Sequence, residues 1–158
     1  MLPIRPLRPG DCQQVIAVYH DAVISQAVGL YSPAQIAAWS QHAQHNDGVR
    51  SSLLRGHGWV SCASHDAAII EAFAVLDPED RLALLYCRGR SSRQGRAASL
   101  LDTLEPHARH RGVRRLRTEA SQLSRPLLER RGWQVEAEET VNLGGVPFLR
   151  WRMGKDLS

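Results

Sequence analysis

Three short apolar segments follow one another near the middle of the chain, and they constrain the fold more than any other part of the sequence. They cover residues 59–63, 68–76 and 82–87, and short turn sequences such as Asp77-Pro78-Glu79-Asp80 separate them. Short segments in which apolar and polar residues partly alternate are typical of β-strands, and short connections favour antiparallel pairing. We therefore predict three successive antiparallel strands.

Helical patterns lie on both sides of these strands. Over residues 12–26 apolar residues recur at helical spacing, and we expect Asp11 and Gln14 to form a capping box. Ser32-Pro33-Ala34-Gln35 indicates a second helix, because it combines a cap, a proline at the first helical position and a glutamine at the third. Further helices are expected over residues 47–54, 94–111 and 124–131. Further strands are expected over residues 4–7, 116–120, 133–143 and 146–153, with Gly144-Gly145 as the turn of a terminal hairpin.

Length and composition are those of an ordinary globular protein. The 158 residues suit a single domain, expected to span residues 1–158, with 43% hydrophobic and 23% charged residues. The 3 cysteines lie far apart without a Cys-x-x-Cys pair, so we expect no disulfide framework and no metal site. The N-terminus lacks the apolar core of a signal peptide, and no apolar run approaches about 20 residues. We expect a cytoplasmic protein without a membrane partner.

A basic, glycine-containing loop joins the strand at 82–87 to the next predicted helix. It ends in Arg93-Gln94-Gly95-Arg96-Ala97. The first amides of a helix have no intrahelical partner, and the helix dipole favours an anion beside them. Gly95 would let a phosphate approach the backbone closely, and Ala97 and Ala98 keep the first turn uncrowded. The pattern indicates phosphate binding, although a solvated loop before a surface helix would have a similar local sequence.

Several segments together resemble the GNAT superfamily of N-acetyltransferases. Ser92-Arg93-Gln94-Gly95-Arg96-Ala97 is similar to the acyl-CoA motif Gln/Arg-x-x-Gly-x-Gly/Ala, except for serine at its first position. Residues 119–133 resemble the strand-to-helix segment that often reads Asn-Ala-Ser…Pro-Phe-Tyr-Glu-Arg-x-Gly-Phe. Residues 8–11 and 31–39 resemble one bacterial branch of the superfamily. The resemblance covers most of the chain, in order and at sensible spacing.

The resemblance implies an α/β (α+β) fold, with a mixed, mostly antiparallel twisted sheet of about seven strands flanked by helices. The implied order is β-α-α-β-β-β-α-β-α-β-β. It also implies transfer of an acetyl group from acetyl-CoA (coenzyme A) to a small-molecule or peptide amine, by direct attack in a ternary complex. The cofactor-binding residues that it implies are Tyr86, Cys87, Arg88, Ser92, Arg93, Gln94, Gly95, Arg96, Ala97, Ala98, Ser124 and Leu128.

The catalytic residues are less clear-cut, because the sequence departs from the family pattern. A strand amide of Tyr86 or Cys87 would polarise the thioester carbonyl. Leu128 occupies the place of a tyrosine that often protonates the thiolate, and Ala83 the place of a frequent acidic residue. Glu119 is the nearest replacement base, with a structural ion pair to a nearby arginine as the alternative.

The acceptor side and the partners leave further alternatives. Tyr31 and Trp39 would form an aromatic wall for the acceptor, or else belong only to the core. Because Leu128 and Ala83 stand where an acid and a base are frequent, the chain would also suit a catalytically weak acyl-CoA sensor or interaction module on the same fold. The arginine-rich stretch 109–117 would attract nucleic acid, yet it lacks interleaved aromatic residues, which makes this the least favoured function. The terminal hairpin would suit pairing in a homodimer.

Overall fold

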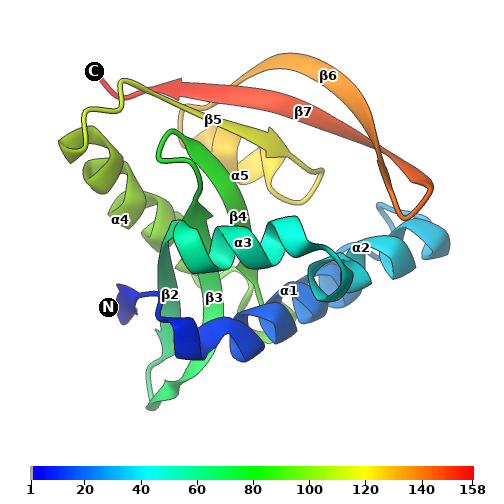
Figure 1. Ribbon diagram of the computed structural model, residues 1–158, viewed down its shortest axis with the longest axis horizontal. Helices are drawn as coiled ribbons and strands as arrows, with labels where there is room; N and C mark the ends of the chain where they lie inside the picture. The colour runs from blue at the N-terminus through cyan, green and yellow to red at the C-terminus, as the bar shows by residue number, and fades with distance from the viewer. Residues whose placement is uncertain (1) are drawn as a thin grey trace.

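A seven-stranded sheet runs through the whole molecule, in the order β1-β2-β3-β4-β5-β7-β6. The computed structural model describes residues 2–158 (Figure 1). All neighbouring strands are antiparallel except β4 and β5, which are parallel. The predicted mixed, mostly antiparallel sheet is therefore confirmed. The strands are β1 (Ile4–Pro6), β2 (His57–Ala63), β3 (Asp66–Leu76), β4 (Arg81–Cys87), β5 (Arg115–Ala120), β6 (Gln134–Leu143) and β7 (Val146–Asp156).

Helices cover both faces of this sheet. Three helices precede β2, one follows β4 and one follows β5, so the predicted order of elements is also confirmed. None of the helices within residues 2–158 is both long and apolar enough to cross a membrane. The helices are α1 (Cys12–Gln26), α2 (Pro33–His45), α3 (Asp47–Arg55), α4 (Arg96–His110) and α5 (Arg125–Arg130), with two short 3-10 helices, η1 (Pro9–Asp11) and η2 (Gly89–Ser91).

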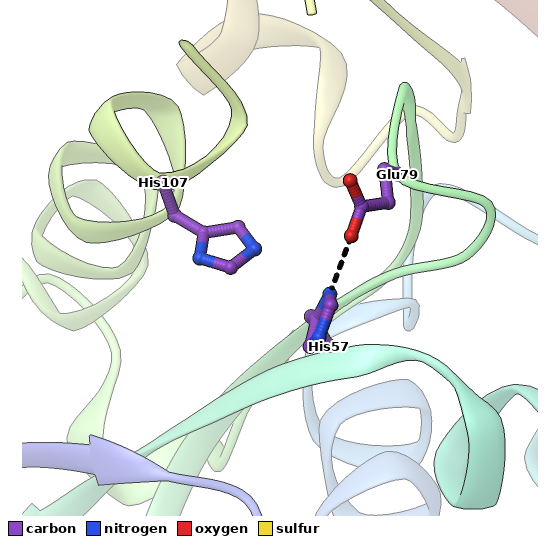
Figure 2. Close-up of side chains that lie close together, drawn as sticks. All are labelled: His57, Glu79 and His107. Carbon is purple, nitrogen blue, oxygen red and sulfur yellow. Dashed lines mark ion pairs between the residues drawn. The ribbon is translucent and has the colours of Figure 1, made fainter. Parts of the chain in front are cut away.

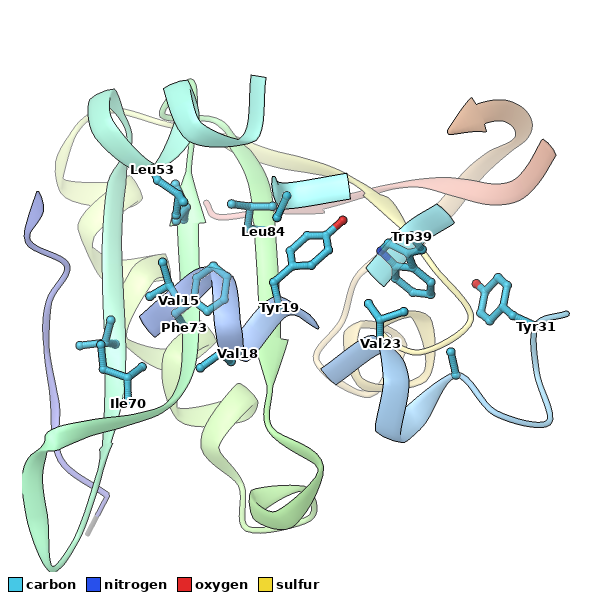
Figure 3. Close-up of a cluster of buried hydrophobic side chains, with 14 of the residues drawn as sticks. Val15, Val18, Tyr19, Val23, Tyr31, Trp39, Leu53, Ile70, Phe73 and Leu84 are labelled. Carbon is cyan, nitrogen blue, oxygen red and sulfur yellow. The ribbon is translucent and has the colours of Figure 1, made fainter. Parts of the chain in front are cut away.

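The alternating side chains of β3 divide the core into two clusters. Phe73 and Val75 face α1, whose Val15 and Val18 are fully buried beside them (Figure 3). Ala72, Ala74 and Leu76 face the opposite side and pack with apolar residues of α4. Because successive side chains of a strand point to opposite faces, one continuous apolar run can serve both clusters. This explains why the predicted strand at 68–76 is apolar almost throughout.

One local prediction is wrong and two are confirmed. The capping box at the start of α1 does not form, because Asp11 accepts instead from the Arg8 amide at 2.8 Å and from the guanidinium of Arg5. Gln14 is thereby free to donate to the Ala68 carbonyl at 2.9 Å, at the edge of β3. A bond between two charged groups is stronger than a neutral cap, which accounts for the exchange. The box at Ser32 and Gln35 does form, and Gly144 and Gly145 make the hairpin turn with φ of 56° and 81°.

Candidate active site

The sheet opens between its two central strands, β4 and β5. These strands form the one parallel pairing among the described strands, and it ends after two residue pairs, the second joining Leu82 to Thr118. Ala83 follows directly and is the extra residue of a β-bulge, since Leu82 and Leu84 lie opposite consecutive residues of β3. A bulge bends the strand that carries it. The bend leads β4 away from β5 and leaves a cleft between them.

A cavity of about 300 Å³ fills this cleft. Residues 81–87 of β4 form one wall, and Thr118 and Glu119 of β5 form the opposite wall. Helices α1, α2 and α5 and the β6–β7 hairpin close its sides. Among the predicted site residues, those that line the cavity are Tyr31, Trp39, Tyr86, Cys87, Ala97, Glu119, Ser124 and Leu128. Sequence positions that are far apart in the chain therefore meet in one place.

The two predicted backbone donors on β4 point in opposite directions. The Arg88 amide donates to the Glu71 carbonyl of β3 at 2.8 Å. Bonded and non-bonded pairs alternate along antiparallel strands, so Tyr86 opposite Phe73 is a bonded pair and Cys87 is not. The Cys87 amide therefore faces the cleft, whereas the Tyr86 amide is turned toward β3. The Cys87 carbonyl is likewise free of β3 and accepts from Gln26 of α1 at 2.6 Å.

The loop between β4 and α4 is anchored by two carboxylates. Glu71 is only 4% exposed, and it accepts from the Arg90 guanidinium at 2.9 Å and from the Ser91 hydroxyl. The bond from Arg90, followed by that from Ser91, outweighs the effect of burial and lowers the pKa of Glu71 to about 2. Asp21 of α1 accepts from the Gly89 amide at 2.9 Å. These contacts fix the loop before it reaches the start of α4.

Two left-handed residues shape the turn at the start of α4. Arg93 has a φ of 64° and Gly95 a φ of 80°. A Cβ built on Gly95 would meet no atom within 4 Å, so the glycine is needed for its backbone angle and the space beside it is open. The amides of residues 96–98 begin the helix without intrahelical partners. The turn therefore combines a glycine beside open space with the unpaired amides of a helix start, and its role in binding phosphate stays a prediction.

Most arginines of this loop and turn bond to groups within the fold. Arg96 is 6% exposed, and its guanidinium donates to the Ser61 hydroxyl at 2.9 Å and the Cys62 carbonyl at 2.8 Å. Arg88 donates to the Ile70 carbonyl at 3.1 Å, and Arg90 is held by Glu71. Arg93 is exposed. The sequence predicts charge from all of them, whereas in the structure Arg88, Arg90 and Arg96 bond within the fold and Arg93 is an exposed guanidinium at the turn itself.

Tyr31 and Trp39 belong to the core and to the cavity wall at once. Their rings meet edge to face with centroids 5.1 Å apart (Figure 3). The Tyr31 hydroxyl accepts from the Gln122 amide at 2.9 Å, and the Trp39 indole donates to the Tyr86 hydroxyl at 3.2 Å. Burial raises the pKa of Tyr86, although the bond from Trp39 opposes this effect. The wall is aromatic, and its polar atoms are bonded within the protein.

Three titratable side chains in the cavity differ in their readiness for proton transfer. Both carboxylate oxygens of Glu119 accept from Nε of Arg81, at 3.1 and 3.2 Å, so the ion pair weighed as the alternative is present. Burial lowers the pKa of His42, which keeps this imidazole neutral near pH 7. Burial raises the pKa of the Cys87 thiol to about 11, which disfavours a thiolate nucleophile. The sequence did not single out His42 for this role, because an isolated histidine on a helix carries no local signal.

The arginine-rich stretch from Arg109 to Arg117 is largely neutralised within the fold. Acidic residues are scarce nearby in the sequence, but carboxylates from distant segments supply the partners. The bonds are Arg109 to the Leu157 carbonyl, Arg111 to Glu79, Arg115 to Glu136 and Asp156, and Arg117 to Asp80. Paired guanidinium groups are less available to a polyanion, which argues against the nucleic-acid alternative.

A mixed sheet that opens between two central parallel strands, with a helix start beside the opening, is the architecture of N-acetyltransferases. The sequence profile of the family described as "Acetyltransferase (GNAT) domain" matches residues 27–155. The chain belongs to this family. It is also 30% identical over 155 residues to the "Uncharacterized N-acetyltransferase YafP" of Escherichia coli K12, covering 96% of this chain and 94% of that protein.

Solved structures share the fold at lower sequence identity. A GCN5-related N-acetyltransferase from Rhodopseudomonas palustris superposes with a TM-score of 0.91 at 22% identity, covering 99% of this chain and 96% of the other. The PaiA N-acetyltransferase of Thermoplasma acidophilum, solved with coenzyme A, gives 0.76 at 17% identity, with 99% of both chains covered. YncA of Salmonella typhimurium, solved with acetyl-CoA, gives 0.66 at 18% identity, covering 100% of this chain and 95% of that one.

Proposed function

We propose that this chain transfers an acetyl group from acetyl-CoA to an amine. The observation that carries the proposal is the cleft between β4 and β5, with the Cys87 amide facing into it and the turn at 93–97 in the connection from β4 to α4. One extended ligand with a thioester at one end and a pyrophosphate at the other would meet both. Relatives of the same fold bind coenzyme A and acetyl-CoA, which supports this choice of ligand.

The pyrophosphate would lie on the amides of residues 96–98. Helix α4 is long enough to have a developed dipole, and it begins directly after Gly95, beside which the space is open. Arg93 adds a positive charge, whereas Arg96 contributes its amide only, because its guanidinium is occupied by Ser61. The pantetheine arm would run into the cleft past Ala97, Ser124 and Leu128, which line the cavity.

The chemistry requires an uncharged amine at the thioester carbon. The amine attacks the carbonyl carbon, and the Cys87 amide stabilises the negative charge that develops on the carbonyl oxygen. The carbon–sulfur bond then breaks, the amine nitrogen loses a proton, and the coenzyme A thiolate gains one. Leu128 has no proton to give, so water is the proposed donor to the thiolate. Positioning two bound substrates supplies most of the remaining acceleration.

Glu119 is the proposed acceptor of the amine proton, directly or through water. It lies on the cavity wall, where both of its carboxylate oxygens already accept from Arg81. Arg81 would therefore compete with the amine for this carboxylate, and for this reason His42 is a second candidate. His42 lines the cavity and is neutral near pH 7 because burial lowers its pKa. A carboxylate and an imidazole titrate in different pH ranges, so they can be distinguished.

The acceptor would bind against the aromatic wall of Tyr31 and Trp39. This wall suits a small-molecule or peptide amine whose carbon skeleton is partly apolar. Pairing of the edge strand β6 with a second copy, giving a homodimer, is a further expectation of the sequence.

Calorimetry with acetyl-CoA and a thiol-release assay would test the proposal. We expect binding of one acetyl-CoA per chain, followed by release of free coenzyme A with at least one member of a panel of polyamines, amino acids, aminoglycosides and peptides. Absence of acetyl-CoA binding would refute the proposed function. Binding without release across the panel would favour the second candidate, an acyl-CoA sensor, which the arginine-paired Glu119 and the inert Leu128 support.

A further inference from the structure

Two histidines and a glutamate meet at the end of the sheet, outside the residues that line the cleft. His57 is the first residue of β2, Glu79 lies in the connection between β3 and β4, and His107 lies in the last turn of α4 (Figure 2). One ligand atom from each residue lies within 4.8 Å of the others. His57 Nδ1 is already 2.9 Å from Glu79 Oε1. Three elements distant in sequence thus bring together three side chains that bind metals.

The ion pair between His57 and Glu79 does not explain the position of His107. Its Nε2 is buried and has no hydrogen-bond partner among residues 2–158. Leaving a buried polar atom unsatisfied is costly, and such an atom calls for a partner. In Figure 2 the ring of His107 extends from α4 toward Glu79 and His57. The Trp59 ring packs against it with centroids 4.9 Å apart, which restricts its orientation.

We propose that His57, Glu79 and His107 bind a divalent transition-metal ion, with Zn²⁺ as the best match. Two imidazole nitrogens and one carboxylate oxygen form a donor set typical of zinc, and the fourth position would hold water. Zinc-to-ligand distances of about 2.0–2.2 Å place tetrahedral ligand atoms about 3.3 Å apart. Small side-chain rotations would bring the three ligands to that spacing, and His57 is exposed at the surface, where it can adjust.

Arg111 is a further charged group that contacts the glutamate of this cluster. Arg111 contacts Oε1 at 2.8 Å and Oε2 at 3.1 Å. The metal would take Oε1 and leave Oε2 to Arg111, which makes Arg111 a competitor as well as a second-sphere partner.

A bound metal would fasten the C-terminal end of α4 to the sheet. The same helix begins at the cofactor turn, so the ion would restrain the helix at the end opposite to the proposed pyrophosphate site. A ligand that binds only the folded protein stabilises it, and at about 100-fold excess over Kd the expected rise in Tm is roughly 5–10 °C.

The test is titration of the full chain, first freed of metal with a chelator, with ZnCl₂ in a calorimeter. We expect one Zn²⁺ per chain, and a weakening of about 10–100-fold or more in His57→Ala and in His107→Ala. His110→Ala removes an exposed histidine of the same helix and is the matched control, with affinity unchanged. Arg111→Gln frees Glu79 from its competitor and is expected to tighten binding.

Cobalt supplies a second measurement, and the Tm of the variant shows whether it is folded. Co²⁺ in the wild-type site should give the visible absorption of a four-coordinate ion with nitrogen ligands, and His57→Ala should abolish it. Because His57 is exposed, this variant is expected to keep the Tm of the metal-free wild type. Lack of zinc binding by the wild type, or equal affinity in wild type and both histidine variants, would overturn the proposal.

Discussion

The two halves of the cleft are built from different parts of the chain. The proposed cofactor half would use backbone amides of one continuous stretch, from Cys87 to the start of α4. The proposed acceptor half would use side chains from separate elements, with Trp39 on α2 and Glu119 on β5. A backbone site needs only a particular local conformation, whereas a side-chain site needs correct packing between distant elements. We therefore expect substitutions in the two halves to affect binding, catalysis and stability differently.

The largest effect is expected in the acceptor half. Glu119→Gln should lower kcat by about 10²–10⁴-fold with acetyl-CoA affinity unchanged, because a neutral amide cannot take the amine proton. The kcat should be measured across pH together with calorimetric binding. If His42 is the base instead, His42→Ala will show the large loss, and the wild-type rate will fall as the histidine becomes protonated in acid.

An exposed histidine on the same helix is the control for this comparison. His45→Ala should leave kcat unchanged, since His45 does not line the cavity. A loss of less than tenfold in both Glu119→Gln and His42→Ala would contradict catalysis by either side chain and leave positioning as the main contribution.

The next largest effect concerns the stability provided by Glu71, which anchors the loop between β4 and α4. This effect depends on pH. The folded protein lowers the pKa of Glu71 from 4.5 to about 2, mainly through Arg90. A carboxyl group with a lower pKa in the folded state stabilises the protein fully above its unfolded pKa. This contribution disappears as the pH falls from about 4.5 toward 2. We expect about 2 kcal/mol, below the full linkage value because the partner Arg90 is 64% exposed.

Urea unfolding at neutral pH and near pH 3 would measure this contribution. The wild type should lose more stability between the two conditions than Glu71→Gln, in which the titrating group is absent. An equal loss in both proteins would show that Glu71 does not carry the acid sensitivity.

A smaller effect separates the ligand role of Gly95 from its conformational role. Gly95 and Gly112 have similar angles, with φ of 80° and 87°, and a Cβ would meet no atom within 4 Å at either position. Alanine at either site should cost about 1–2 kcal/mol of stability. Only Gly95→Ala should also weaken acetyl-CoA binding, by about tenfold, because it alters the turn that presents the amides. Equal affinities in the two variants would remove the phosphate role of this turn.

The sequence predicted local backbone structure better than contacts between distant side chains, for physical reasons. Strand periodicity, the Ser32 capping box and the turn at Gly95 are local patterns, and each follows from neighbouring residues. Three other features depend on contacts with strands distant in sequence. They are the bulge at Ala83, the direction of the Tyr86 amide toward β3 rather than the cleft, and the burial of Arg96.

The same reasoning explains the charged residues that were hard to interpret. Arg117 pairs with Asp80 and Arg81 with Glu119, across 37 and 38 positions of sequence. The histidine–glutamate cluster at the end of α4 also spans three elements, and spacing along one helix does not reveal it. Local sequence supports a prediction about backbone, while partnerships between side chains require the fold.

The smallest expected effect concerns the aromatic wall of Tyr31 and Trp39. It tests whether the hydrogen bond of the Trp39 indole matters for function. Trp39 and Trp133 are both buried, 6% and 2% exposed, but only the Trp39 indole has a partner, the Tyr86 hydroxyl at 3.2 Å. Trp133 Nε1 is buried without a hydrogen-bond partner among the described residues. Phenylalanine at either position removes an indole, so the two substitutions have similar packing costs. Trp39→Phe should therefore cost about 1 kcal/mol more than Trp133→Phe, because it alone breaks a hydrogen bond.

Steady-state kinetics would show whether the Trp39 hydrogen bond also affects binding of the acceptor amine. Trp39→Phe should raise KM for the amine a few-fold while the affinity for acetyl-CoA stays constant, since Trp39 lines the cavity from α2, an element separate from the turn at 93–97. Trp133→Phe should change neither quantity. A change in acetyl-CoA affinity in Trp39→Phe would mean that the aromatic wall also shapes the cofactor half, and the division of the cleft into two independent halves would then be wrong.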